Sequence, residues 1–249
     1  MKGAGWGAAI VFCLAFLLPG WGFAARPLFT EDAETLEKGS AKIEMGFDHA
    51  RGNSGDKYNL SFLQVAYGLM DSLEIAAGLP YIFLDPKEGG RVDGVGDLYA
   101  YLKYRVWEER GFYPALALKP ILKIPLADEY KGLGSGKTDF GFNAAFSKSF
   151  TGFNLNFDAT YVFYGEKNVT DQLNLGLAGE FEIAKGLNLV SEIRYGNNFN
   201  SSRKDDPATL MAGFQADALG AVFDAGVTLG LNSAAPDYLL TVGVTLIFK

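Results

Sequence analysis

Residues 237–248, DYLLTVGVTLIF, alternate between apolar and small or polar side chains. One face carries Tyr238, Leu240, Val242, Val244, Leu246 and Phe248, and the other carries Thr241, Gly243 and Thr245. A period of two is that of a β-strand whose faces meet different surroundings. The stretch is longer than the roughly five or six residues usual in soluble sheets, and it matches the roughly 9–11 tilted residues that cross a bilayer. It therefore predicts a transmembrane β-strand.

The same pattern recurs along the chain and predicts strands at residues 41–51, 57–68, 73–84, 96–107, 112–124, 138–149, 153–164, 172–183, 187–198, 207–217, 221–231 and 237–248. Every second connection is short, and the others are mostly longer and more polar. Bacterial outer-membrane barrels combine an even strand number, short periplasmic turns and long external loops. We therefore predict an all-β fold, an antiparallel transmembrane β-barrel of about twelve strands. A soluble β-sandwich is the alternative, but it would need shorter strands packed against a second sheet.

The N-terminus predicts export. Residues 1–24 have the pattern of a cleaved signal peptide, with an apolar core at 8–18 and small residues, Gly22 and Ala24, before the cleavage site. Residues 25–40 are acidic and lack a strand pattern, so we expect a periplasmic N-terminal lead-in, and residues 41–249 form the barrel. The sole cysteine, Cys13, falls in the signal peptide, which excludes thiol chemistry in the mature chain.

These features place the protein in the outer membrane of a Gram-negative bacterium. We expect its partners to be outer-membrane lipids, small-molecule solutes and the barrel assembly machinery. A net charge of −7 argues against nucleic acid as a partner.

Strand parity assigns many charged side chains to the lumen. One wall would carry Lys103, Arg105, Lys119 and Lys123, and the other side would carry Asp158, Glu180, Glu182, Glu192, Asp217 and Asp224. A basic wall facing an acidic wall predicts a polar constriction that selects permeants by charge and size. The alternative is a set of salt bridges that fill a narrow interior, because barrels of about eight strands are filled and barrels of about sixteen are open. In either case the charges need partners or water, since an unpaired buried charge is costly.

Four aromatic residues, Tyr99, Tyr101, Trp107 and Tyr164, also have inward parity. They are candidates for an aromatic lumen lining, although an inward tyrosine is equally consistent with ordinary packing around a hydrogen-bonding tip. The strand at 57–68 loses its parity at Phe62 and Leu63, which predicts a β-bulge there.

Enzymatic chemistry finds little support. His49 is the only histidine, and it lies next to inward-facing Asp48, so we expect it to face lipid and to be unavailable as a general base. Residues 131–138, KGLGSGKT, lack the first glycine of a phosphate-binding loop and no helix follows them. Asp93 and Asp97 supply too few oxygen ligands for Ca²⁺. We therefore predict no enzyme, no catalytic residue, no cofactor and no metal.

Residues 26–39, together with GVGD at 94–97, LKYR at 102–105, KIP at 123–125 and GLGSG at 132–136, resemble the MetA-pathway of phenol degradation family. The resemblance implies an outer-membrane barrel that transports hydrophobic or aromatic compounds. Many such barrels end in an aromatic residue, whereas this chain ends in Lys249.

The leading functional hypothesis is therefore a porin-like channel or transporter for passive passage of small solutes. One alternative is a closed structural or adhesive surface barrel. The other is a barrel hydrolase, which the placement of His49 disfavours.

Overall fold

The computed structural model describes residues 26–52, 56–87, 90–167, 169–198 and 205–249. The signal-peptide prediction for residues 1–24 lies outside these ranges. The described residues form a 3₁₀-helix, η1 (Glu129–Lys131), and thirteen strands: β1 (Ala41–Arg51), β2 (Lys57–Met70), β3 (Leu73–Asp85), β4 (Val92–Val95), β5 (Leu98–Trp107), β6 (Ala115–Ile124), β7 (Asp139–Phe150), β8 (Phe153–Phe163), β9 (Gln172–Ala184), β10 (Leu187–Gly196), β11 (Ala208–Ala218), β12 (Ala221–Gly230) and β13 (Tyr238–Phe248). Within the same ranges, no helix is long and apolar enough to cross a membrane.

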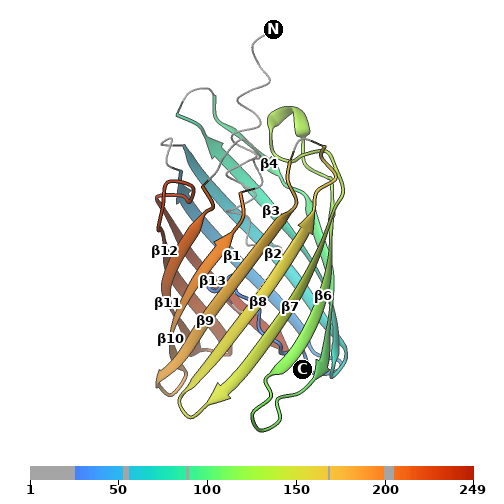
Figure 1. The fold of residues 1–249 in the computed structure, drawn as a ribbon, viewed down its shortest axis with the longest axis vertical. Helices are drawn as coiled ribbons and strands as arrows, with labels where there is room; N and C mark the ends of the chain where they lie inside the picture. Colours follow the sequence, from blue (N-terminus) through green and yellow to red (C-terminus); the bar gives the residue numbers. More distant parts are fainter. Residues whose placement is uncertain (1–25, 53–55, 88–89, 168, 199–204) are drawn as a thin grey trace.

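Twelve of the strands close into a barrel. Each pairs antiparallel with its neighbours, and the last pairs with the first, so that Ala41 of β1 lies opposite Phe248 of β13. β4 lies on the edge of β3 that also pairs with β5: it pairs with Tyr81–Leu84 where β5 pairs with Leu73–Gly78, so it extends the line of β5 toward the end of the barrel that carries the longer connections. Figure 1 shows the tilted strands wrapped around one cylinder. The predicted antiparallel transmembrane barrel of about twelve strands is therefore confirmed, while β4 was missed because it lies within a stretch predicted as a loop.

The two ends of the barrel differ, as the sequence predicted. At one end the connections are tight, such as the one between β9 and β10, where Gly186 adopts a positive φ of 72° that glycine tolerates readily. We call this the short-turn end. The longer connections gather at the opposite, long-loop end, where η1 also lies (Figure 1).

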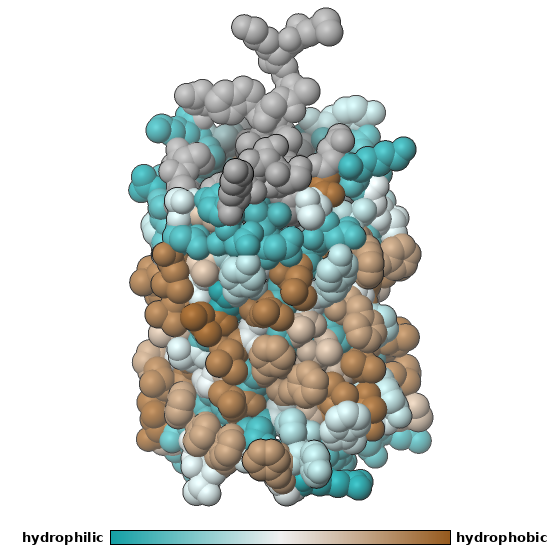
Figure 2. Space-filling model, in the orientation of Figure 1, coloured by the Kyte–Doolittle hydropathy of each residue, from teal (hydrophilic) through white to brown (hydrophobic). Residues whose placement is uncertain are grey.

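The outer surface is a belt of large apolar side chains. Leu63, Phe142 and Phe214 are among many outward residues that remain 44–50% exposed. Near the short-turn end, the ring of Phe153 stacks on those of Phe150 and Phe181 at centroid distances of 4.6 and 5.6 Å. Figure 2 shows the apolar belt below a hydrophilic zone at the long-loop end. A belt of this kind matches the hydrocarbon layer of a membrane.

The bulge predicted at Phe62 and Leu63 is wrong. β2 pairs with both neighbours through this point without a break, and its register with β3 shifts instead at Gly68 and Met70. Phe62 is 5% exposed and faces inward, whereas Leu63 is 48% exposed and faces outward. The inward side of β2 is itself apolar here, so two successive apolar residues do not mark a change of face.

Candidate functional site: the barrel lumen

Residues 26–39, which we call the plug segment, lie inside the barrel instead of outside its mouth. The segment has no helix or strand, and its side chains and backbone contact inward-facing residues of the wall. Only its C-terminal part reaches the short-turn end, where the backbone N–H of Gly39 donates to the carbonyl of Gly68 at 2.8 Å. The position differs from the expected periplasmic lead-in, because the wall supplies charged and polar partners that draw the segment into the lumen.

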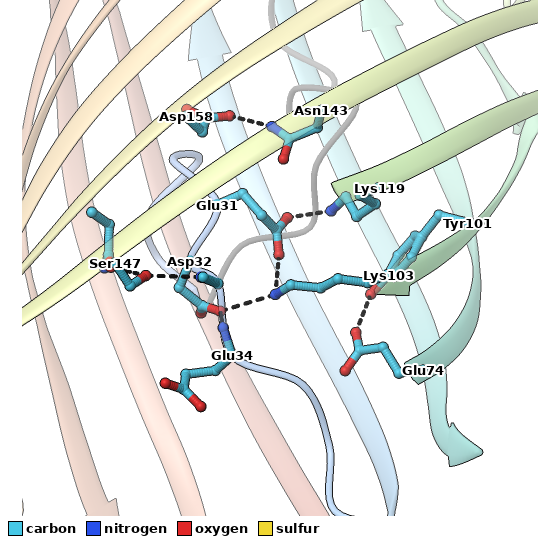
Figure 3. A network of polar contacts seen from close by, with 12 residues as sticks. Glu31, Asp32, Glu34, Glu74, Tyr101, Lys103, Lys119, Asn143, Ser147 and Asp158 are labelled. Atoms are coloured by element: carbon cyan, nitrogen blue, oxygen red, sulfur yellow. Dashed lines mark hydrogen bonds and ion pairs between the residues drawn. The ribbon is translucent and has the colours of Figure 1, made fainter. Parts of the chain in front are cut away.

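Glu31 of the plug segment lies between two lysines of the basic wall (Figure 3). Lys103 Nζ donates to Glu31 Oε1 at 2.7 Å, and Lys119 Nζ donates to Glu31 Oε2. The three side chains are at most 4% exposed. The Lys119 ammonium also lies 4.3 Å from the ring centroid of Tyr101, a favourable cation–π distance.

Asp32 adds a second carboxylate to this cluster. Lys103 Nζ donates to Asp32 Oδ1 at 2.9 Å. Burial alone would raise the pKa of Asp32, but the Lys103 ammonium, together with Lys42 and the backbone N–H of Glu34, holds the pKa below its ordinary value. The plug segment therefore presents two anionic side chains to the basic wall.

Arg26 binds the opposite, acidic wall. Its guanidinium donates to Asp224 Oδ1 at 3.3 Å, to Asp48 Oδ1 at 3.4 Å and to the hydroxyl of Thr241. The carbonyl of Val242 accepts from it at 2.8 Å. The plug segment thus places positive charge against β1 and β12 and negative charge against β5 and β6.

The backbone of the plug segment is also held. Glu192 on β10 accepts from the N–H of Phe29 at 2.9 Å and from the N–H of Thr30 at 2.7 Å. The hydroxyl of Ser147 on β7 accepts from the N–H of Ala33 at 2.8 Å. These contacts and the ion pairs join the segment to opposite sides of the ring, so it crosses the lumen.

Glycines make room for this segment on the inward face. Gly46 and Gly243 lie opposite each other in the ladder of β1 and β13, and a Cβ at either position would overlap the Arg26 guanidinium. A Cβ at Gly176 would overlap Thr30 in the same way. Glycine in a strand often marks a close approach of this kind, and the barrel interior is shaped for the plug segment.

The four predicted basic residues do not form one site. Lys103 and Lys119 converge on Glu31, whereas Lys123 pairs with Asp97 at 3.2 Å and Asp139 at 2.5 Å. Arg105 lies toward the short-turn end and binds Glu34 at 3.0 Å.

The predicted acidic residues also divide by depth. Asp158, Glu192 and Asp224 are buried, with exposures of 1%, 2% and 6%. Asp158 accepts a hydrogen bond from Asn143 at 2.6 Å, and Glu180 accepts one from Asn156 at 2.6 Å. Glu182 and Asp217 are exposed near the ends of β9 and β11. Their role in selectivity stays a prediction.

Two of the four aromatic candidates, Tyr99 and Tyr101, face inward and are buried. Tyr164 is half-buried, and its hydroxyl donates to Gln172 at 2.9 Å. The prediction for Trp107 is wrong, because the register shifts between Arg105 and Trp107. That shift pairs Trp107 with outward-facing Leu116 and leaves its side chain 46% exposed.

A buried apolar cluster lines part of the lumen, and parity reasoning missed it because apolar side chains were assigned to the lipid face. It joins Tyr99, Tyr101 and Phe62 to neighbours on other strands and to Leu133 of the loop after η1. Further members are Tyr58, Leu60, Ile82, Leu84, Ile121, Val162 and Leu239. The interior therefore offers both charged and apolar surface.

His49 lies away from this interior. Its Nδ1 is 2.7 Å from Asn59 Oδ1, and its ring is 6.0 Å from that of Tyr238. It alternates along β1 with buried Asp48, whose carboxylate binds Arg26 inside the barrel.

Comparison with known proteins identifies the family. The sequence model described as "Putative MetA-pathway of phenol degradation" matches residues 24–248. The chain belongs to this family, which confirms the resemblance seen in the sequence. None of the curated proteins compared with the chain matches it.

Solved outer-membrane proteins share the fold. The COG4313 outer membrane channel from Pseudomonas putida F1 is 16% identical with a TM-score of 0.71, over 87% of this chain and 98% of the channel. The NanC porin is 9% identical with a TM-score of 0.57, over 83% and 98%. The beta domain of the Bordetella autotransporter BrkA is 13% identical with a TM-score of 0.54, over 84% and 99%. At these identities the likeness shows the outer-membrane barrel fold.

Proposed function

We propose that this family member is an outer-membrane channel for passive passage of small solutes, closed here by the plug segment. The observation that carries the proposal is the path of that segment, which crosses the lumen and binds both walls through charged side chains. A barrel that served only as a membrane anchor would not need a polar interior matched to a separate segment. The similar folds named as a channel and a porin support the same function.

The plug segment is suited to reversible closure. It adds no strand to the sheet, so its release would leave the closed ring of ladder hydrogen bonds intact. When the whole segment leaves, water can enter the lumen and hydrate the wall charges that its ion pairs neutralised, which offsets part of the cost of breaking those pairs. Opening would therefore require movement of the segment and not a rearrangement of the barrel.

Hydrophobic or aromatic compounds are the proposed solutes. The family description refers to phenol degradation, and the lumen contains the buried cluster around Tyr99 and Tyr101. In this arrangement the short-turn end would face the periplasm, as it does in bacterial barrels. The lumen charges would tune selection, so neutralising Lys119 and Lys123 is expected to shift ion selectivity toward cations, measured as a change in reversal potential.

A cysteine lock tests the closure. Ala33→Cys and Ser147→Cys place two thiols where the Ser147 hydroxyl already contacts the backbone of Ala33. In planar bilayers, we expect discrete conductance steps from the wild type, silence from the oxidised double variant and recovery after reduction. Each single cysteine variant, treated with the same oxidant, is the control and should conduct like the wild type.

Two other outcomes would contradict the proposal. If folded wild type and Glu31→Gln both remain silent, the channel is excluded and the closed surface barrel replaces it. Conductance that ignores the lock would mean that solutes bypass the plug segment.

A further inference from the structure

We infer that the pocket holding Glu31 is a carboxylate-binding site of the barrel wall, and that the permeant solutes are organic acids that compete with Glu31 for Lys103 and Lys119. This inference rests on the proposed channel and names its substrate class. In the closed state, Glu31 occupies the site as an internal stand-in for the permeant carboxylate.

The site is built from two facing cations. The pairs Tyr101–Ile121 and Tyr104–Leu118 bracket Lys103 and Lys119, which places these lysines opposite each other on β5 and β6. Like charges in that position repel. The two oxygens of the Glu31 carboxylate relieve the repulsion, because each oxygen accepts from a different ammonium.

Without the plug segment, the net charge of the basic wall would be one that a monoanion neutralises. Lys42 pairs with Glu44 at 3.2 Å, and Glu74 lies opposite Lys103 in the ladder. Without the plug segment, Lys42, Lys103 and Lys119 would face Glu44 and Glu74, an excess of one positive charge. Asp158 on β8 and Glu192 on β10, with Arg194 near both, continue the lumen wall beyond β7, and their carboxylates would repel a more highly charged anion.

The surroundings also select an organic body over an inorganic ion. Tyr101 lies against Lys119 and belongs to the buried apolar cluster, as does its cross-strand neighbour Ile121. A solute bound through its carboxylate would therefore place its apolar part on aromatic and aliphatic side chains. Aromatic and short aliphatic monocarboxylates match both surfaces.

Competition with Glu31 sets the solute concentration at which the plug segment is displaced. A group tethered to the protein acts at an effective concentration on the order of millimolar. A free carboxylate must reach a comparable concentration to displace Glu31, so the plug segment would open more often as the solute becomes abundant.

Calorimetric titration of the Glu31→Ala protein, purified from outer membranes, tests the site directly. Propionate replaces the missing carboxylate, and we expect it to bind at least about tenfold more tightly than to the wild type, a difference of about 1.4 kcal/mol. Glu34→Ala is the matched control, since Glu34 binds Arg105 at the solvent-accessible mouth, and it should behave as the wild type. Adding Lys119→Met to Glu31→Ala should abolish binding.

Neutral propionamide and chloride separate the alternatives. Binding of either one as tightly as propionate, or no binding at all, would overturn the inference. If Glu31→Ala does not fold, the wild type gives the same answer: benzoate should accelerate amide exchange at Phe29 and Thr30, and benzamide should not.

The inference and the proposed channel can fail separately. Propionate binding in a barrel that never conducts would retain the site and remove the channel. Conduction without carboxylate binding would retain the channel and remove the substrate class.

Discussion

Two ion pairs join the plug segment to the same strand, only two residues apart, and they differ strongly in how far water can reach them. Lys103 binds Glu31 at 2.7 Å in the middle of the lumen, with side chains 4% and 2% exposed. Arg105 binds Glu34 at 3.0 Å near the short-turn end, with side chains 15% and 70% exposed. Similar geometry therefore has different consequences, because water can replace a lost partner at the mouth and cannot reach the one inside.

The largest effect is expected from Glu31→Gln, which leaves the buried Lys119 without its anion. Breaking a buried pair in this way costs about 3–5 kcal/mol. We expect amide exchange at Thr30 to accelerate by at least about a hundredfold, since each 1.4 kcal/mol is a factor of ten, or to reach the rate of an unstructured peptide. An acceleration of exchange at Thr30 no larger than that caused by Glu34→Gln would contradict the contrast between the buried pair and the exposed pair.

Glu31→Gln leaves the Lys119 ammonium without its anion. Removing that ammonium should restore part of the stability that the single substitution takes from the plug segment. In the double variant Glu31→Gln/Lys119→Met no unpaired charge remains at this point, so the cost of an uncompensated buried charge is removed. Double-mutant coupling of about 1–3 kcal/mol is expected from exchange rates of both single variants and the double variant. Strict additivity would mean that Lys119 and Glu31 are energetically independent.

Gly46→Ala tests the room made for Arg26. The new Cβ would overlap the guanidinium, and overpacking of this kind costs about 1–3 kcal/mol. Amide exchange at Phe29 should rise while the barrel stays folded, as judged by circular dichroism. Gly90→Ala is the control because a Cβ added there would meet no described atom within 4 Å, and equal effects of the two substitutions would refute the steric explanation.

The smallest effect belongs to Glu34→Gln. An exposed pair contributes about 0.2–1 kcal/mol and is screened by salt. Amide exchange at Thr30 should change by less than about fivefold at low salt, a factor that corresponds to about 1 kcal/mol, and the difference from the wild type should shrink in high salt. A large acceleration of exchange that salt does not change would show that water is excluded from the pair of Arg105 and Glu34 as fully as from the pair of Lys103 and Glu31.

The strands were predictable because their pattern is local. β1 was expected at residues 41–51 and occupies Ala41–Arg51, since alternation along eleven residues fixes which side chains meet lipid. The inner surface was predictable only in part. Lys103 and Lys119 have inward parity, but their partner Glu31 lies 72 and 88 residues away along the chain.

Other parts of the site carried no periodic signal. The plug segment is acidic and irregular, and its complementarity to the basic wall becomes visible only when β5 and β6 stand beside it. Trp107 was assigned to the lumen because a single register shift at the end of β5 reverses its face, and such a shift leaves no mark in the sequence.

The sequence was enough to predict the class of fold, the number of long amphipathic strands in the closed barrel and the difference between its two ends. They follow from short-range alternation, which the membrane enforces at every lipid-facing position. What fills the barrel emerged from the folded chain: residues 26–39 cross the lumen, Gly46 and Gly243 leave space for Arg26, and Glu31 bridges two lysines. Those contacts join residues distant in the chain, and their stability depends on burial, which exists only after the barrel has closed.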